Sequence, residues 1–478
     1  MRRRRFLASL AAGSAAAARQ QKDSAAAAGR GRPNFLFLIA DDLTYRSVQD
    51  LNNPEVATPN FNRLMRRGCT FTHCFHQGSW SGAVCIASRS MLNSGLSAFR
   101  AQRRIEQSPL WGETLGAAGY DTAIIGKWHL SDATLKRSFR NIGPVSGGMF
   151  ESGPDAYNRP SPGNTWTPWD TSLKGQWLET KTWHPAAGEP IEHSARVWSE
   201  LAASYLAKRS EQSNPFFLYV GFNSPHDPRQ APKEFVDRYP KERIAIPPNY
   251  LPDHPFDQGD NRVRDELLAP FPRSREAVQL HRSEYYAHIS YLDAQVGNLL
   301  DVLDKSPQAA NTYVIFTADH GLAVGQHGLM GKQNLYDHSI RMPLFVTGPG
   351  IPAGKRVDEM VYQHSAFATT CDLAGIATPK TVEFPSLVDF LKGHGRPPHD
   401  AMFSYYRGFQ RAVRTREHKL IVYPVAGKTQ LFDLQKDPWE IRNVADEPRY
   451  RSVRASLLER LHRFQHDLED DLPPVQLR

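Results

Sequence analysis

The chain has 478 residues, of which 40% are hydrophobic and 23% are charged. These proportions are typical of globular proteins and exclude a fibrous or wholly disordered chain, and the length suffices for one large domain with a smaller one appended. The net charge of +8 could suggest a nucleic-acid partner, but residues 1–28 alone carry a net charge of +5. The remainder is an ordinary mixed surface, so no nucleic-acid partner is expected.

Residues 1–28 are organised like an export signal. Arginines at positions 3 to 5 precede Phe6, Leu7 and a run of small apolar residues through Ala18, a pattern that resembles a twin-arginine signal. A disordered basic tail is the alternative. The apolar run is too short for a stable membrane anchor, and no other window offers about 18 consecutive apolar residues. We therefore expect a soluble mature protein, periplasmic or secreted, that is exported by the twin-arginine machinery.

Four continuous apolar runs each end shortly before polar residues of a catalytic type. The runs are residues 35–40, 122–125, 216–220 and 313–316, and the polar residues that follow them are Asp41, Asp42, Lys127, His129, His226, Asp319 and His320. Such continuous apolarity indicates strands buried on both faces, as in a parallel sheet covered by helices. Helical patterns at 59–67 and 284–304 alternate with the runs, which predicts a doubly wound α/β domain. In such sheets ligands bind beyond the carboxyl ends of the strands, so the polar residues should converge.

Two regions depart from this alternation. Residues 143–190 are rich in glycine and proline with little periodicity, which predicts an insertion, and its tryptophans are Trp166, Trp169, Trp177 and Trp183. These rings could stack on sugars or pack the loop onto the domain. After a catalytic domain at 33–375, short strand-like runs and an amphipathic helix predict a small C-terminal α+β subdomain at 376–478.

Three acidic residues indicate a metal site. Asp41 and Asp42 bring two carboxylates into one small volume, which is costly unless a cation neutralises them. Asp319 adds a third at another strand end, although any single strand-end aspartate could instead cap a helix. Three carboxylates on two converging strands favour a hard divalent cation, Ca²⁺ or Mg²⁺.

The four cysteines are too few for a disulfide scaffold, and they are Cys69, Cys74, Cys85 and Cys371. Cys69 and Cys74 lie near His73 and His76 but lack the paired spacing of a zinc site. A local disulfide or two buried thiols is therefore expected for this pair.

The segment from Cys85 to Arg89 reads Cys-Ile-Ala-Ser-Arg, and Gly95 follows it after Leu-Asn-Ser. This resembles the signature of the formylglycine-dependent sulfatase family, with Ala87 in place of the commoner proline and Ser94 in place of threonine. The resemblance extends from Asn34 to about residue 446. Its further elements lie at 126–130, 224–226, 317–321, 331–336, 341–344 and 431–438.

The resemblance implies an alkaline-phosphatase-like fold with a mixed, mostly parallel sheet, and a catalytic role for each matching residue. Cys85 would be oxidised by a formylglycine-generating enzyme, and the hydrated aldehyde would attack sulfur with one hydroxyl and expel sulfate with the other. Arg89 would hold the hydrate, and His129 would hydrogen-bond it. Lys127 and Lys332 would neutralise the sulfate oxygens, and His226 would protonate the leaving oxygen. The implied ligands of a Ca²⁺ ion, or of Mg²⁺, are Asp41, Asp42, residue 85, Asp319 and His320.

The same residues also bear on rival functions. A cysteine-dependent phosphatase needs five residues between cysteine and arginine, and here there are three. A phosphate or phosphonate ester hydrolase of the same superfamily could use the same modified cysteine and stays an alternative. A non-catalytic relative should have lost a metal carboxylate or a sulfate-binding lysine, and none is lost. The expected substrate is a sulfated carbohydrate, with choline or aryl sulfate esters as alternatives.

Overall fold

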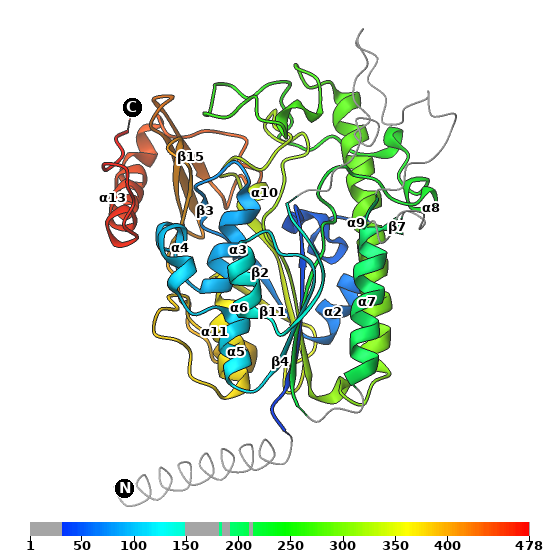
Figure 1. Ribbon diagram of the computed structural model, residues 1–478. Coiled ribbons are helices and arrows are strands. Elements are labelled where there is room, and N and C mark those ends of the chain that lie inside the picture. The colour runs from blue at the N-terminus through cyan, green and yellow to red at the C-terminus, as the bar shows by residue number, and fades with distance from the viewer. Residues whose placement is uncertain (1–30, 149–180, 184–191, 210–213, 478) are drawn as a thin grey trace, which may run out of the picture.

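The computed structural model describes residues 31–148, 181–183, 192–209 and 214–477 (Figure 1). The predicted export signal at 1–28 and three of the four insertion tryptophans lie outside these residues, and for Trp183 only the backbone is described. None of the described helices has the length and apolarity that crossing a membrane requires.

An eight-stranded sheet forms the centre of the molecule, in the order β11-β2-β10-β9-β1-β8-β4-β5. Strand β10 runs antiparallel to both of its neighbours, and the other paired strands are parallel. The strands are β1 (Asn34–Ala40), β2 (Cys69–Phe75), β4 (Asp121–Lys127), β5 (Asn141–Ser146), β8 (Phe216–Gly221), β9 (Thr312–Ala318), β10 (Arg341–Thr347) and β11 (Lys355–Tyr362). The predicted α/β fold with a mixed, mostly parallel sheet is therefore confirmed.

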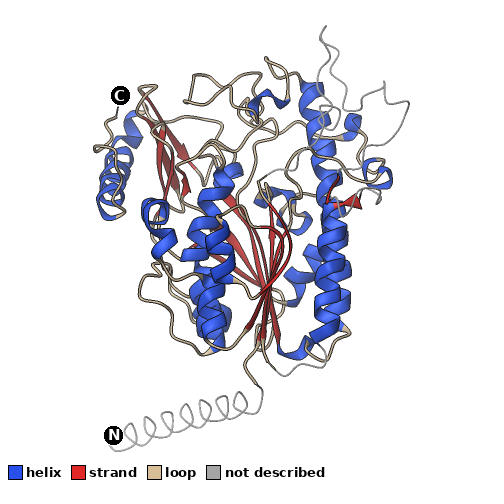
Figure 2. Cartoon of the chain, in the orientation of Figure 1, coloured by secondary structure: helices blue, strands red, loops and turns tan. Residues whose placement is uncertain are grey.

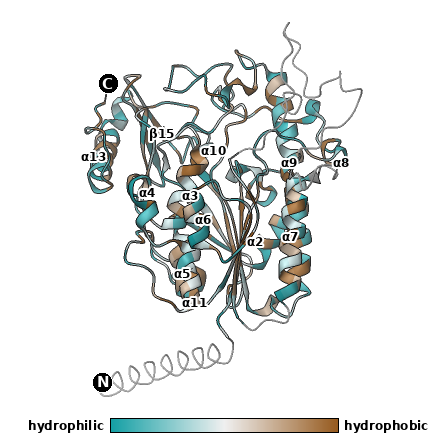
Figure 3. Cartoon of the chain, in the orientation of Figure 1, coloured by the Kyte–Doolittle hydropathy of each residue, from teal (hydrophilic) through white to brown (hydrophobic). Residues whose placement is uncertain are grey.

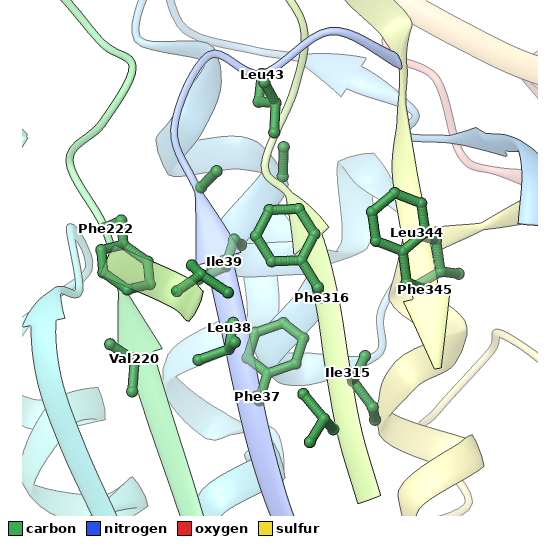
Figure 4. Close-up of a cluster of buried hydrophobic side chains, with 14 of the residues drawn as sticks. Phe37, Leu38, Ile39, Leu43, Val220, Phe222, Ile315, Phe316, Leu344 and Phe345 are labelled. Carbon is green, nitrogen blue, oxygen red and sulfur yellow. The ribbon is translucent and has the colours of Figure 1, made fainter. Parts of the chain in front are cut away.

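The four apolar runs of the sequence are β1, β4, β8 and β9, which lie side by side in the sheet. Every residue of β1 is buried, and Phe37 stands in register with Tyr219 on one neighbour and Ile315 on the other. Figure 4 shows Phe37, Phe316 and Phe345 within the cluster of apolar side chains on these strands. Each such side chain contributes roughly 1.5–3 kcal/mol on burial, which explains why these strands carry no polar alternation.

Helices cover both faces of this sheet (Figure 2). One face carries α3 (Val84–Ser94), α4 (Ala98–Arg104), α5 (Trp111–Ala117), α6 (Asp132–Ser138) and α11 (Ala366–Ala374), and the other carries α2 (Pro59–Arg67), α7 (Ser194–Lys208), α8 (Lys233–Val236) and α9 (Arg275–Asp304). Figure 3 shows hydrophobic and hydrophilic stretches along the same helices, as expected for helices that pack on one side only.

Helix α9 begins nine residues before the start predicted from the sequence, at Arg275 instead of Glu284. Its first turns are rich in charged and polar residues, which interrupt the apolar spacing. Ser274 provides the start signal, because its side chain accepts a hydrogen bond from the N–H of Ala277.

The first residues of the predicted insertion belong to strand β5, which pairs with β4 at the edge of the sheet. This strand was not predicted from the sequence, because Gly143 and Pro144 are residues that usually indicate a loop. An edge position tolerates proline, because only one side of the strand has to supply hydrogen bonds to a neighbour.

A second sheet of five strands, in the order β15-β14-β13-β12-β3, builds the predicted C-terminal α+β subdomain. Its strands are β3 (Gly78–Ser79), β12 (Met402–Tyr406), β13 (Gln410–Arg414), β14 (His418–Tyr423) and β15 (Lys428–Asp433), and α13 (Arg451–Asp467) packs on it. Two short helices, α10 (Asp337–Ile340) and α12 (Val388–Lys392), and a hairpin of β6 (Lys181–Trp183) with β7 (Glu192–His193) complete the elements. The two-residue strand β3 ties the segment before α3 to this small sheet.

The cysteines are free and buried in the described structure. Cys69 and Cys74 both lie on β2, five residues apart, so their side chains point to opposite faces of the sheet. Of the two expectations for this pair, buried thiols are therefore the correct one.

Candidate active site

The polar residues that follow the four central strands come together at one edge of the sheet, because the carboxyl ends of adjacent parallel strands meet there. Asp41 and Asp42 follow β1, Lys127 ends β4, His226 follows β8, and Asp319 follows β9. Backbone hydrogen bonds join the loops, from Asp41 N to Ser224 O (3.1 Å) and from Asp319 N to Ala40 O (3.1 Å). The sheet therefore fixes the positions of these side chains relative to one another.

Cys85 is the second residue of α3 and is 2% exposed. Its Sγ lies 3.1 Å from His129 Nδ1. Burial raises the pKa of the thiol, but the positive charge of Lys127 above all, together with the neighbouring His129 and His320, holds the pKa well below its ordinary value. The amino end of a helix also favours negative charge, so this position suits a nucleophile or an oxyanion.

Arg89 lies one helical turn after Cys85 and is fully buried. Its Nε donates to Asp319 Oδ2 (3.0 Å), and its Nη1 donates to Lys127 O (2.8 Å). Its Nη2 is buried without a hydrogen-bond partner. The guanidinium thus orients Asp319 and keeps one donor atom unpaired inside the buried site.

Two buried lysines each face one of the paired aspartates. Lys127 Nζ donates to Asp41 Oδ2, and Lys332 Nζ lies 2.9 Å and 3.2 Å from the two carboxylate oxygens of Asp42. Burial raises the pKa of Asp41, but Lys127 above all holds it well below the ordinary range. Burial lowers the pKa of Lys332, whereas Asp42 and Asp265 raise it well above its ordinary value. The charged forms of Asp41 and Lys332 are therefore favoured by the opposite charges beside them.

The ligand atoms of Asp41, Cys85, Asp319 and His320 lie within 4.8 Å of one another, and all four residues are buried. Asp41 Oδ1 and His320 Nε2 have no hydrogen-bond partner. His320 Nδ1 lies 3.0 Å from Gly321 O, and Nε2 lies 3.6 Å from Asp319 Oδ1. Burial lowers the pKa of His320, but Asp319 and Asp42 raise it to about 9, so a bound cation would displace the proton from Nε2. Burial and the neighbouring Asp41 raise the pKa of Asp319 to about 6. These residues fit a divalent cation, which would satisfy the unpaired atoms and the crowded negative charge.

Asp42 lies beside this group and faces His226 and Asp227. His226 Nε2 is 3.9 Å from Asp42 Oδ2, and His226 Nδ1 is 2.7 Å from the Asp227 carbonyl oxygen. Asp42 Oδ1 is also 3.2 Å from His320 Nδ1. The Asp42 carboxylate thus lies between Lys332, His226 and the candidate metal ligands.

Two residues of the site have a left-handed backbone, with φ of 67° at Asp42 and 62° at His129. This conformation costs residues other than glycine roughly 1–2 kcal/mol and persists only where the surroundings enforce it. It turns the chain immediately after β1 and β4, so that Asp42 and His129 face the site. Gly148 packs against His129 so closely that an added Cβ would lie 2.3 Å from Nε2.

Three polar residues near the site were not predicted from the sequence. Asp227 directly follows His226, and this adjacency could have indicated it. Asp265 Oδ2 lies 3.8 Å from Lys332 Nζ, and Gln363 Nε2 donates to the carbonyl oxygen of Asp319 (3.0 Å). Asp265 and Gln363 come from segments without a motif, so only the fold brings them to the site.

Comparison with known families agrees with this geometry. The model of the sulfatase family matches residues 33–376, and a model described as N-sulphoglucosamine sulphohydrolase, C-terminal, matches residues 325–467. The chain belongs to the sulfatase family, within the alkaline phosphatase superfamily. It is accordingly a sulfuric ester hydrolase.

The relatives differ in the substrates that their names give. A choline-sulfatase of Rhizobium meliloti is 29% identical over 444 residues, which cover 88% of this chain and 83% of the relative. A structure described as a complex with its substrate D-glucosamine-2-N,6-O-disulfate has a TM-score of 0.71 at 20% identity and covers 93% of this chain and 99% of its own. A phosphonate monoester hydrolase of Silicibacter pomeroyi has a TM-score of 0.71 at 21% identity, with 92% and 96% covered. The two structures therefore support the fold alone.

Proposed function

We propose that the protein hydrolyses sulfate monoesters of carbohydrates and that its nucleophile is formylglycine, made from Cys85 by a formylglycine-generating enzyme. One observation carries this proposal. The Cys85 side chain lies at the amino end of α3, 3.1 Å from His129, in a buried site that also holds Arg89 and two lysines. A sulfate ester is an anion and a poor electrophile, so its hydrolysis requires cationic groups and a strong nucleophile at one point.

The proposal includes a divalent cation, Ca²⁺ or else Mg²⁺, held by Asp41, Asp42, residue 85, Asp319 and His320. The unpaired atoms Asp41 Oδ1 and His320 Nε2 support it, because a buried carboxylate and imidazole need a partner there. When bound, the cation would activate the hydroxyl of residue 85 and withdraw charge from the sulfate oxygens.

The protein side chains supply the remaining functions. Lys127 and Lys332 are positioned to neutralise sulfate oxygens, and Arg89 Nη2 is free to hold the hydrated aldehyde. His129 Nδ1 lies within reach of the nucleophile and can hold its proton. The Nδ1 of His226 lies 2.7 Å from the carbonyl oxygen of Asp227. This contact directs Nε2 toward the site, where it can protonate the leaving oxygen.

Choline or aryl sulfate esters form the second candidate substrate class. The 29% identity with a choline-sulfatase over most of both chains favours it. A screen of defined sulfated sugars, choline sulfate, a chromogenic aryl sulfate and a phosphonate monoester distinguishes these classes. We expect the highest kcat/KM on a sulfated sugar, and a higher value on either other class would replace the carbohydrate assignment.

The decisive test of the nucleophile is Cys85 itself. The proposed nucleophile attacks with one hydroxyl and expels sulfate with a second one, and neither an unmodified thiol nor an alanine provides these groups. Cys85→Ala should therefore abolish turnover and leave the melting temperature nearly unchanged. Cys85→Ser should be almost as inactive. In active protein, mass spectrometry of the tryptic peptide from residue 68 to residue 89 should show an aldehyde at Cys85 that reacts with a hydrazide probe. Cys69→Ser is the matched control and should retain the aldehyde. Full activity with only free thiol at Cys85 would refute the mechanism.

A further inference from the structure

A pocket of about 590 Å³ lies between α3, α6 and the end of β5, and His129, which contacts Cys85, forms part of its wall. Its lining includes Trp80, Ile86, Glu106, His129, Asp132 and Val145. The volume lies within the range of pockets that enclose small-molecule ligands. None of these residues except His129 belongs to the catalytic set described above.

The pocket reaches the site of chemistry through His129 and Ile86. One ring nitrogen of His129 contacts Cys85 Sγ at 3.1 Å, and the same half-buried side chain forms part of the pocket wall. Ile86 directly follows Cys85 on α3 and also lines the pocket. A group attached to a sulfate at residue 85 can therefore extend into this pocket.

The charge of the pocket is opposite to that of the sulfate site. Among the described residues, its lining includes the exposed carboxylates of Glu106 and Asp132 and no lysine or arginine. Ser131 Oγ donates to Glu106 Oε1 (2.7 Å), which fixes that carboxylate. Arg137 lies nearby, but its guanidinium donates to the Glu106 carbonyl oxygen (2.6 Å) and pairs with Glu113 (2.7 Å). Like charges repel at short range, so this pocket disfavours a second anionic group on the substrate.

The rest of the lining suits a sugar ring. Trp80 is half-buried and presents an aromatic surface on which the apolar face of a ring can stack, and Ile86 and Val145 add apolar contacts. The carboxylates of Glu106 and Asp132 can accept hydrogen bonds from ring hydroxyls. A trimethylammonium group would also meet an aromatic ring and carboxylates, but it fills little of 590 Å³.

We propose that this pocket receives the alcohol part of the substrate and selects an uncharged sugar ring with a single sulfate over one that carries a second sulfate or a carboxylate. The inference rests on the proposed sulfatase function and narrows its substrate class. Glu106 and Asp132 are the residues that set the selectivity against a second charge, and Trp80 provides the stacking surface.

The test compares N-acetylglucosamine 6-sulfate with D-glucosamine-2-N,6-O-disulfate. The wild type should prefer the monosulfate by about tenfold or more in kcat/KM. The double variant Glu106→Gln, Asp132→Asn should reduce that preference about tenfold, mainly through a lower KM for the disulfate. Trp80→Ala should raise KM for both sugars. Asp301→Asn, an exposed residue of α9, is the control and should change none of these values.

Binding separates this inference from the proposed function. Calorimetric titration of Cys85→Ala protein with the two sugars measures the selectivity without turnover, so it gives an answer even if the enzyme acts on another class of ester. Tighter binding of the monosulfate, lost in the triple variant that adds Glu106→Gln and Asp132→Asn, supports the pocket. Equal affinities, a preference for the disulfate or for choline sulfate, or a double variant with unchanged selectivity would overturn it.

Discussion

Asp319 connects three parts of the active site. Its Oδ2 accepts from Arg89 Nε (3.0 Å), and its Oδ1 accepts from the backbone N–H groups of His320 (3.0 Å) and Asp42 (3.3 Å). The side chain also belongs to the group of candidate metal ligands. Burial and Asp41 raise its pKa to about 6, and a bound cation would favour the ionised form and lower this pKa.

We therefore expect Asp319→Asn to weaken metal binding while the protein stays folded. The amide keeps the shape of the carboxylate but removes one negative charge, so metal affinity should fall at least tenfold. Metal content after dialysis, measured by atomic spectroscopy, and turnover on adding back Ca²⁺ or Mg²⁺ test this. Asp301→Asn is again the control. Full activity of the wild type in excess chelator after exhaustive dialysis would refute the metal assignment.

The start of α2 is capped by another helix. Thr58 occupies the position before the helix, as the sequence predicts, but its Oγ1 accepts a hydrogen bond from Gln49 N (2.9 Å). The free N–H groups of Asn60 and Phe61 donate to Asp293 of α9 at 3.1 Å and 2.7 Å. A side chain more than 200 residues away thus performs the capping.

Asp293→Ala should destabilise the protein by roughly 1–3 kcal/mol, because it leaves buried N–H groups without acceptors. Burial raises the pKa of Asp293 to about 6, although hydrogen bonds from Phe61 and Asn60 lower it. The stability linked to this raised pKa is complete below about pH 4 and is lost as pH rises through about 6. Urea unfolding should therefore show a larger difference between wild type and Asp293→Ala at pH 5 than at pH 7.5. Equal differences at both pH values would contradict the assignment.

Elements with a continuous apolar core were predictable from the sequence, and elements that depend on distant partners were not. The four central strands appear as apolar runs because both of their faces are buried, so the convergence of Asp41, Lys127 and Asp319 could be predicted as well. Strand β3 has two residues and exists only because β12 pairs with it. The pocket proposed to bind the sugar likewise brings together Trp80, Glu106 and Asp132, and no spacing in the sequence connects these residues.

At the scale of the molecule, the small sheet is fixed to the large domain by buried ion pairs. Lys419 of β14 is fully buried, and its Nζ lies 2.6 Å from Asp337 Oδ1 and 2.6 Å from Glu440 Oε1. Asp337 begins α10, next to the central sheet. The pairing therefore couples the folding of the two parts.

Lys419→Met should destabilise the protein by about 3–5 kcal/mol, because it leaves two buried carboxylates with too little compensating charge. Calorimetry should show a lower melting temperature for one shared transition. Lys428→Met, on an exposed position of β15, is the matched control. A melting temperature equal to that of the wild type would show that the buried pairs contribute nothing to stability.

We also propose that the arginines at positions 3 to 5 direct a folded protein through the twin-arginine pathway to the periplasm. Replacing all three with lysine should leave the protein in the cytoplasm, as measured by cell fractionation and immunoblotting. Periplasmic accumulation of that variant would instead support the disordered-tail alternative for residues 1–28.

The burial of Cys85 bears on the order in which the proposed modification, folding and export could occur. Strand β3 ends six residues before Cys85 and pairs with Tyr405 and Tyr406 of β12, so the segment around the thiol is completed only after most of the chain has been synthesised. Once it is complete, only 2% of Cys85 is exposed, and an enzyme that modifies this residue cannot reach it. Under the proposed modification and the proposed twin-arginine export of a folded protein, oxidation of Cys85 would precede folding, and folding would precede export. The proposed modifying enzyme would then act in the cytoplasm, on chains that are still incomplete or have just been released.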